Sequence, residues 1–180
     1  MRTLQLEPLT RDAFAPFGDV IEAGPHGSAA NQGTATRFDF AAALTNLRPH
    51  ARANVAVFRA LPRELPMRVK LLERHPRSTQ MFVPMSATRY AVLVAHARED
   101  GTPDTETLRA FECRAQQAIN YRVNVWHHPM IALDRPSDFV MLAWEDRSPE
   151  DCVEHWFAEK IELVARAEGH SPSETVHKKS

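Results

Sequence analysis

The sequence contains little glycine, little cysteine and no excess of charge of either sign. Only 6 glycines occur in 180 residues, so a glycine-rich loop that cradles nucleotide phosphates has little support. Lys and Arg total 22 and Asp and Glu total 23, which gives a formal net charge of -1. Such a balance offers no field for a nucleic-acid backbone or an anionic membrane. The composition argues against both as partners, and the bulk charge names no other partner.

Long hydrophobic runs are also absent. Residues 1–9 include Arg2 and Glu7 and never build the apolar stretch of a secretory signal, and no later run approaches ~18 uncharged apolar residues. The two cysteines, Cys113 and Cys152, lie far apart without CxxC spacing, which argues against a disulfide framework and a thiolate zinc site. Both are expected to be buried thiols. We expect a cytoplasmic, membrane-free protein.

Strand-like runs dominate the middle of the chain. A hydrophobic fraction of 43% in 180 residues allows one well-buried core and argues against two domains. Short runs rich in β-branched and aromatic residues predict seven strands, at residues 53–60, 67–75, 80–85, 88–97, 106–114, 124–133 and 138–144. Their close spacing leaves no room for crossover helices, so the fold is predicted to be mainly β, a sandwich or a barrel.

Only short helices are expected around these strands. Thr10 can cap a helix that runs through Phe14, and Asp39 can cap another that begins at FAAAL and ends before Pro49. The stretch 149–167 has mixed signals and fits either a terminal helix or an irregular segment with one strand. These helices would decorate the barrel without forming a layer.

The boundaries of the domain follow from composition. Residues 1–164 are predicted to form a single catalytic domain, and the polar residues 165–180 a disordered tail. Within the domain, residues 81–85 are apolar on both alternating faces. A sheet with two apolar faces must be covered on both. In so short a chain, we expect a second copy to cover one of them, as a homodimer.

Polar residues end one apolar run in MRVKLLERHPRSTQMFVPM. Strand alternation places four residues on one inward face, which are Val69, Leu71, Glu73 and His75. A charged side chain on a core face is costly unless it is paired, hydrogen-bonded or bound to a cation. The strand can simply leave the core at its end, but Gln80 at the start of the next apolar run favours a polar pocket.

A second cluster, INYRVNVWHHPMIAL, holds adjacent histidines. His127 and His128 point to opposite faces of a strand, so we predict that His127 enters the pocket and His128 faces away. A single buried histidine is more often structural than catalytic, so His127 gains its meaning from the first cluster. Tyr121 and Trp126 flank these histidines and can either line the pocket or pack in the core. Tyr121 is the better candidate for a substrate contact.

The spacing of the first cluster resembles the first motif of the cupin fold. Glu73, one residue, His75, four residues, Gln80, six residues and Ala87 follow the pattern of His-x-His, a short gap, Glu, six residues and Gly. Glu, Gln and Ala replace the usual His, Glu and Gly. The positions of the metal ligands in that motif therefore fall on Glu73, His75 and Gln80.

The second cluster resembles the second cupin motif, Pro-x-Gly-x-x-His. Arg122 stands in place of Pro, Asn124 in place of Gly, and His127 at the histidine. Asn tolerates the positive φ that such a turn position favours. The two motifs together indicate a barrel with a polar pocket.

Beyond this spacing, the chain resembles the ureidoglycolate lyase family, formerly called ureidoglycolate hydrolase. The resemblance runs from about Leu4 to about Val164 and rests on FGDVIE, on residues 31–38 (NQGTATRF), on LERHPRSTQMFVPM and on INYRVNVWHHPMIAL. The segment after Trp144 matches poorly. The resemblance implies a cupin-like double-stranded β-helix, a jelly-roll barrel with a few short peripheral helices, usually present as a homodimer.

The resemblance also implies an activity. The family splits (S)-ureidoglycolate into glyoxylate and urea in allantoin breakdown, a step of purine nitrogen catabolism. The substrate carries a carboxylate, a hydroxyl and a ureido nitrogen on one carbon, so cleavage needs a base for the hydroxyl proton and an acid for the leaving nitrogen, without added water. Glu73, His75 and His127 are the available catalytic groups, and the sequence does not assign base and acid among them.

Four residues are expected to contact the substrate, namely Asn31, Arg37, Gln80 and Tyr121. Arg37 has the planar fork that grips a carboxylate, and Asn31 can add an amide donor. The alternative is an ordinary surface arginine beside a loop asparagine.

A divalent metal ion is the open question. Glu73, His75, Gln80 and His127 can bind an ion through two imidazoles and two oxygens, and the resemblance implies nickel or a related ion. The same residues can instead hydrogen-bond the substrate in a metal-free site. No organic cofactor is expected.

Two other functions share this geometry. A different metal cupin enzyme, such as a dioxygenase or a sugar-phosphate isomerase, would use the same barrel but leaves residues 31–37 unexplained. A non-enzymatic ligand-sensing barrel of a transcription regulator would need a DNA-binding helical domain, for which the chain has no residues left.

Overall fold

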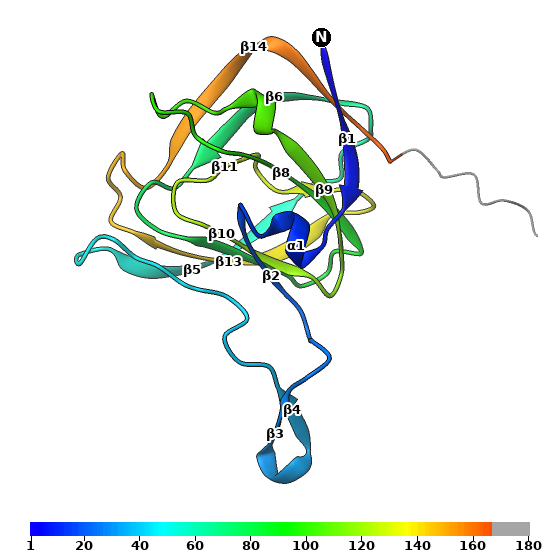
Figure 1. Ribbon diagram of the computed structural model, residues 1–180, viewed down its shortest axis with the longest axis vertical. Coiled ribbons are helices and arrows are strands. Elements are labelled where there is room, and N and C mark those ends of the chain that lie inside the picture. The colour runs from blue at the N-terminus through cyan, green and yellow to red at the C-terminus, as the bar shows by residue number, and fades with distance from the viewer. Residues whose placement is uncertain (167–180) are drawn as a thin grey trace, which may run out of the picture.

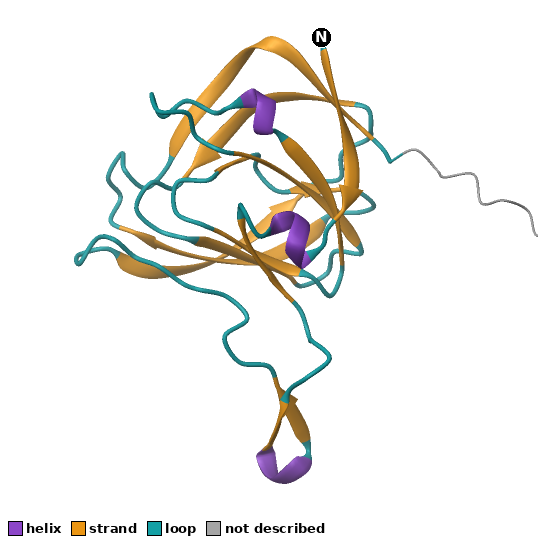
Figure 2. Ribbon diagram, viewed as in Figure 1, coloured by secondary structure: helices purple, strands orange, loops and turns teal. Residues whose placement is uncertain are grey.

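The structure is a computed structural model that describes residues 1–166. Strands make up most of it (Figures 1 and 2). In chain order the elements are β1 (Arg2–Pro8), α1 (Arg11–Phe14), β2 (Gly18–Ile21), β3 (Ser28–Ala30), η1 (Asn31–Gly33), β4 (Ala35–Arg37), β5 (Arg52–Ala60), β6 (Met67–Arg74), β7 (Gln80–Pro84), β8 (Arg89–Ala95), η2 (Thr105–Thr107), β9 (Arg109–Arg114), β10 (Ala118–Tyr121), β11 (Trp126–His127), β12 (Ile131–Ala132), β13 (Ser137–Glu145) and β14 (Val153–Val164). The prediction of a mainly β fold is confirmed.

One sheet closes on itself into a ring. Its strands follow the order β11-β6-β14-β1-β9-β8, and a further pairing of β11 with β8 closes the circle. The sheet is mixed, because β1 runs parallel to both β14 and β9, while the other pairs in the ring are antiparallel. Closure removes the free sheet edges that otherwise invite aggregation. The result is a closed mixed barrel, in line with the cupin-like architecture.

A second, antiparallel sheet packs against this ring. Its order is β2-β10-β7-β13-β5, and it forms the lower layer of the barrel in Figure 1. Successive side chains of β8 point in opposite directions, into two different hydrophobic cores. Leu93 lies in the core inside the ring, whereas Val92 and Val94 lie in the core between the ring and the second sheet, with Phe82 and Phe139. The candidate site lies in the second of these cores.

The short helix at Thr10 is confirmed. The Thr10 hydroxyl accepts a hydrogen bond from the Ala13 amide at 3.2 Å and caps α1, which satisfies one of the free amides at a helix start. Phe14 in this helix is fully buried, and its ring meets Phe111 edge to face at 5.6 Å between centroids. The helix thereby anchors the start of the chain to the core.

The second helix, predicted from Asp39, is wrong. Asp39 pairs with Arg37 at 2.9 Å in place of capping a helix, and Phe40 has a positive φ of 55°, which is incompatible with a right-handed helix. The segment after it is extended, because its amides bond to the barrel: the Thr45 amide donates to the Thr79 hydroxyl at 3.1 Å. Tertiary hydrogen bonds therefore replace the local ones of a helix.

Near the C-terminus, a strand replaces the helix that the sequence also allowed. β14 pairs with β6 and β1 and completes the ring, so the alternative with one strand holds. The pairing of β14 with β6 shifts between Trp156 and Ile161. The simple alternation predicted for β6 fails there as well, since Leu72, and not Leu71, shares the ring core with Val69. The predicted tail lies almost wholly outside the described residues.

Residues 24–40, which we call the arm, leave the barrel between β2 and β5. The arm holds β3, η1 and β4, and Figure 1 shows it extending from the barrel on the far side of the second sheet from β6 and β11. β3, η1 and β4 contact mainly one another. Among the described residues, no helix has the length and apolar character needed to cross a membrane.

Candidate active site

His127 lies at the centre of the polar cluster. It occupies the two-residue strand β11, held between β6 and β8, where its register partners are Glu73 and Val94. Its side chain is buried, and its Nε2 lies 3.5 Å from Oε1 of Glu73. Its Nδ1 lies 3.0 Å from the carbonyl oxygen of Val125. The ring nitrogen Nδ1 therefore donates to the backbone, and Nε2 faces the acidic residue.

His75 approaches His127 from the end of β6. The two imidazoles stack with 5.4 Å between centroids and an angle of 21°. Nδ1 of His75 donates to the backbone carbonyl of Asp151, and its Nε2 is buried with no hydrogen-bond partner. A buried nitrogen without a partner is rare in proteins. The Nε2 lone pair is therefore free for a substrate or a metal ion.

The second sheet contributes the other wall of the cluster. Gln80 and Tyr121 are register partners on β7 and β10. The side-chain oxygen of Gln80 lies 3.0 Å from Nε2 of His127, and the ring of Tyr121 stacks on that imidazole at 4.0 Å and 12°. The Tyr121 hydroxyl is buried without a partner. Two strands of each sheet thus bring these side chains together.

Burial and charge act in opposite directions on the titratable groups. Burial works to raise the pKa of Glu73, but the hydrogen bond and charge of His127, with His75 and His128, outweigh it and hold that pKa below its usual value. Burial, with the charge of His127, lowers the pKa of His75 to about 4. Burial also raises the pKa of Tyr121 well above 10.0. At neutral pH, Glu73 is ionised, His75 is neutral and Tyr121 keeps its proton.

The donor set fits a divalent cation. Because both histidines donate through Nδ1 to carbonyls, each carries a lone pair on Nε2 when its imidazole is neutral, and the Nε2 of His127 then points at the oxygens of Glu73 and Gln80. Lone pairs that face one another repel unless a proton or a cation lies between them. One ligand atom each from Glu73, His75 and His127 lies within 4.8 Å of the others. Imidazole nitrogens with carboxylate and amide oxygens are ligands of divalent transition metals.

The two remaining predicted residues lie elsewhere. Asn31 and Arg37 are on the arm, exposed, and on the far side of the second sheet from β6 and β11 (Figure 1). Arg37 pairs with Asp39 within the arm through hydrogen bonds of 3.0 and 3.1 Å. Within one chain, the structure brings together Glu73, His75, Gln80, Tyr121 and His127, and it does not bring Asn31 and Arg37 to them.

Sequence reasoning missed two neighbours of the cluster. Asp151 orients His75 through its backbone carbonyl, a role that leaves no signal in residue type. Cys152 lies with its sulfur 3.9 Å from Oε2 of Glu73, and it is exposed, so the prediction that both cysteines are buried is wrong for this one. It lies in the loop between β13 and β14.

The neighbouring residues of β11 follow the predicted alternation. Trp126 lies in the core inside the ring, and its indole nitrogen donates to the Gly101 carbonyl at 3.1 Å. His128 lines a separate cavity of about 310 Å³ with Met130 and Trp156. Of the two adjacent histidines, only His127 belongs to the cluster.

The similarity of the chain to known proteins agrees with this geometry. The sequence model of the family described as ureidoglycolate lyase matches residues 1–164. The chain belongs to the ureidoglycolate lyase family. The match covers the five-residue cluster and the arm.

Relatives from three pseudomonads carry the name ureidoglycolate lyase. The protein of Pseudomonas entomophila (strain L48) is 39% identical, over 91% of this chain and 97% of its own length. That of Pseudomonas savastanoi pv. phaseolicola is 40% identical, over 91% of this chain and 95% of its own. That of Pseudomonas aeruginosa (strain LESB58) is 39% identical, over 91% and 96%. The similarity therefore extends over almost the whole of each protein.

Proposed function

We propose that the chain is a ureidoglycolate lyase that splits (S)-ureidoglycolate into glyoxylate and urea. The family match and the names of the relatives support this activity. The observation that carries the chemistry is the buried cluster, in which an ionised carboxylate, two imidazoles and a free phenol converge. A role in allantoin breakdown follows from the same substrate.

Glu73 is the group that moves the proton. Its Oε1 faces His127 at 3.5 Å, and its Oε2 is on the side of the exposed Cys152. Its side chain keeps 20% exposure, against 2% for His127, so a substrate reaches it first. The carboxylate takes the proton of the substrate hydroxyl, the carbon-nitrogen bond breaks as the new carbonyl forms, and the proton passes to the ureido nitrogen.

Tyr121 and Gln80 position the substrate. The Tyr121 hydroxyl keeps its proton and has no partner in the chain, so it donates a hydrogen bond to an oxygen of the bound molecule. The amide of Gln80 offers a nitrogen donor beside its oxygen, which lies 3.0 Å from His127. Stacking of Tyr121 on His127 fixes the orientation of both. Preorganised donors of this kind stabilise charge that develops in the reaction.

A divalent ion of the nickel type is part of the proposal. Glu73, His75 and His127 would hold it, with the Gln80 oxygen as a fourth ligand, because their lone pairs already face one another. When bound, such an ion would supply Lewis acidity that makes the substrate hydroxyl more acidic. The backbone carbonyls of Asp151 and Val125 keep both imidazoles in the tautomer that can bind it.

A cytoplasmic homodimer is the proposed form of the enzyme. On the outer face of the second sheet, Val57 pairs with Val140, and Val140 with Val83. Val55 and Met85 add exposed apolar surface, at 65% and 61%. Apolar surface of this kind commonly marks an interface. The free thiols Cys113 and Cys152 fit a reducing compartment.

The direct test is a product assay. Purified protein is incubated with (S)-ureidoglycolate, and glyoxylate, urea and ammonia are followed with and without a chelator. We expect equal amounts of glyoxylate and urea, and loss of turnover after the metal is removed. Ammonia and carbon dioxide in place of urea would identify an amidohydrolase and overturn the lyase assignment. Full turnover of the metal-free protein would overturn the proposed role of the ion.

A further inference from the structure

None of the five side chains of the buried cluster is a guanidinium or an ammonium group that could bind a substrate carboxylate. Two arginines of neighbouring segments, Arg48 and Arg74, have other partners. Arg48 is bonded to Asp146 and Asp151, and Arg74 is bonded to Asn124 and covers the Trp126 ring at 4.8 Å. A carboxylate is normally gripped by a charged fork. The cluster therefore lacks a cationic group for a substrate that carries a carboxylate.

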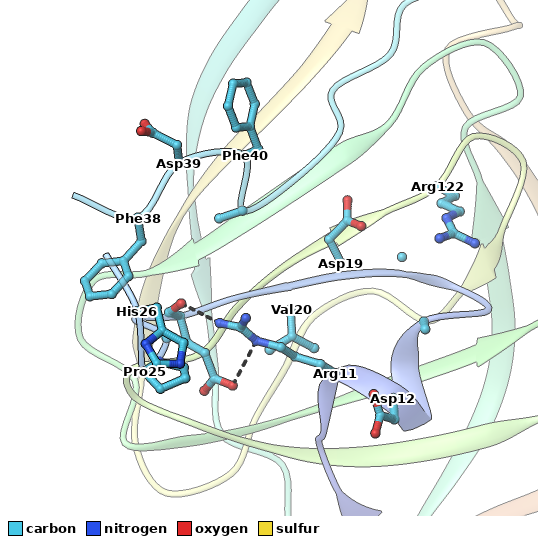
Figure 3. A pocket seen from close by; sticks show the side chains of 15 residues that line it. Arg11, Asp12, Asp19, Val20, Pro25, His26, Phe38, Asp39, Phe40 and Arg122 are labelled. Atoms are coloured by element: carbon cyan, nitrogen blue, oxygen red, sulfur yellow. Dashed lines mark hydrogen bonds and ion pairs between the residues drawn. The ribbon is translucent and has the colours of Figure 1, made fainter. Parts of the chain in front are cut away.

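An exposed guanidinium lies on the arm, that of Arg37, which pairs at the surface with Asp39. It is on the other side of the second sheet from the cluster of its own barrel (Figure 1). Both ends of the arm are fixed. Arg11 donates to the Glu22 carbonyl at 2.7 Å (Figure 3), and beyond the arm the Ala43 amide donates to the Asp19 carboxylate at 3.1 Å. Ala43 also accepts from the Asn120 amide at 3.1 Å. These bonds direct the arm away from the barrel that carries it.

The arm does not stabilise itself. A two-stranded hairpin alone is marginally stable in water, and this one is exposed along most of its length. Its turn holds Asn31 and Gln32 at φ values of 50° and 58°, in the left-handed region that most non-glycine residues other than Asn and Asp avoid. Packing against another surface would stabilise a hairpin of this kind.

A second copy of the chain supplies that surface. Val57, Val140 and Val83 pair across the outer face of the second sheet, and Figure 1 shows the arm extending from the side of that sheet that faces away from β6 and β11. Phe40, at the root of the arm, is 100% exposed, and Figure 3 shows its ring directed away from Arg11. Leu44 and Leu47 follow it at 47% and 57% exposure. In a symmetric dimer, the same surface patch is buried on both subunits. Each copy would therefore cover the arm of the other.

Charge complementarity indicates what the arm binds. Arg37 lies at the base of the β3–β4 hairpin, opposite Ser28, and is 69% exposed, and its guanidinium suits the carboxylate that the proposed substrate carries. The pair of Arg37 with Asp39 is exposed, and exposed pairs contribute little to stability. Arg37 can therefore exchange this partner for a bound carboxylate.

We propose that the arm of one subunit completes the active site of the other, with Arg37 binding the substrate carboxylate across the interface and Asn31 beside it. The inference rests on the proposed lyase function and deepens it. Each site then consists of Glu73, His75 and His127 from one subunit and the arm of the partner. A monomer would hold the proton-transfer groups but lack the group that grips the substrate.

Mixed dimers test this directly. Chains with two different affinity tags are co-expressed, and dimers that carry both tags are purified. When Arg37→Ala is paired with His127→Ala, the site with intact His127 receives an intact arm, so we expect about half of the wild-type activity. When the double variant Arg37→Ala, His127→Ala is paired with wild type, we expect almost none, because the one intact cluster receives the altered arm.

The opposite pattern, no activity in the first mixed dimer and half in the second, would place the arm on its own barrel and overturn the proposal. So would full activity of the Arg37→Ala homodimer, or failure to recover any dimer that carries both tags. Arg114→Ala, an exposed arginine outside the arm, is the matched control and is expected to keep wild-type activity.

A second readout keeps the two proposals separable. If wild-type protein does not cleave (S)-ureidoglycolate, the proposed function fails, and the arm is then located by a photo-cross-linker at position 36 of one tagged chain. Links to residues 73–80 or 121–128 of the other tagged chain support the exchange of arms. Links confined to the same chain contradict it.

Discussion

The buried cluster and the arm hold the two parts of the predicted site, and they are built in opposite ways. His127 is 1% exposed and is fixed by a backbone carbonyl, a carboxylate and two stacked rings. Arg37 is largely exposed and is held by a single surface pair. The groups proposed to move protons are thus fixed within one chain, whereas the group proposed to bind the substrate carboxylate would depend on a partner.

This difference has a physical basis. Proton transfer requires atoms held at hydrogen-bond distance, which a closed ring of strands provides. Recognition of a carboxylate tolerates a longer and more mobile element, because a guanidinium fork makes strong bonds wherever it meets its partner. Variants of the two regions should therefore fail in different ways.

The largest effect is expected for His127→Ala. Loss of this imidazole removes a proposed metal ligand, the partner of Glu73 and the stacking face of Tyr121, so we expect kcat to fall by about 1,000-fold or more. Steady-state kinetics with (S)-ureidoglycolate measure it. The control is His128→Ala, whose side chain lies in a different cavity and which should keep most activity. Equal losses in both variants would contradict the assignment.

The sequence predicted this cluster well, because it depends on local spacing. Glu73, His75 and Gln80 lie within eight positions of one another, and β-strand alternation with a short turn brings them to one place. The change of face along β6 was missed, since it comes from the shifted pairing with β14. Asp151 was missed because a backbone carbonyl has no sequence signature.

Arg37→Ala is expected to have the next largest effect, of a different kind. Loss of a charge-assisted, forked bond to a carboxylate should lower kcat/KM by about 100-fold, mainly through KM. The melting temperature should hardly change, because the side chain is exposed. Arg37→Lys should recover part of the loss, since it restores the charge without the fork. A fall in kcat alone, at constant KM, would contradict a binding role.

Placement of the arm could not be predicted from sequence. The block at residues 31–38 marked its residues, but nothing local indicates that the chain leaves the barrel there. The helix expected after Asp39 failed for a related reason, because the Thr45 amide bonds to Thr79, far away in sequence. Interactions between segments distant in the sequence decide this region, and in our proposal interactions between subunits do so as well.

A smaller effect is expected for Val57→Glu, which places a charge on the outer face of the second sheet. Burying an unpaired carboxylate at an interface costs about 3 kcal/mol, so we expect dissociation and about a tenfold loss of specific activity at low protein concentration. Sedimentation and activity are measured on the same dilution series. Leu61→Glu, at a similar exposure of 69% but outside this face, is the control. An active Val57→Glu monomer would contradict the need for a partner.

The smallest effect is expected for Tyr121→Phe. The hydroxyl has no partner in the chain, so its removal should leave thermal stability unchanged or raise it. The loss of one donor to the substrate should lower kcat/KM by about fivefold. Calorimetry and kinetics measure the two quantities. A clear drop in melting temperature would mean that the hydroxyl supports the fold and not the substrate.

The most direct measurement is nickel binding to the purified chain by calorimetry, with Glu73→Gln, His75→Ala and His127→Ala compared one by one. If these side chains form one site, wild type binds one ion per chain, and each variant loses most of that affinity, although the three positions come from separate strands and loops. Unchanged binding in any one of the variants, or no binding by the wild type, would contradict the single shared site.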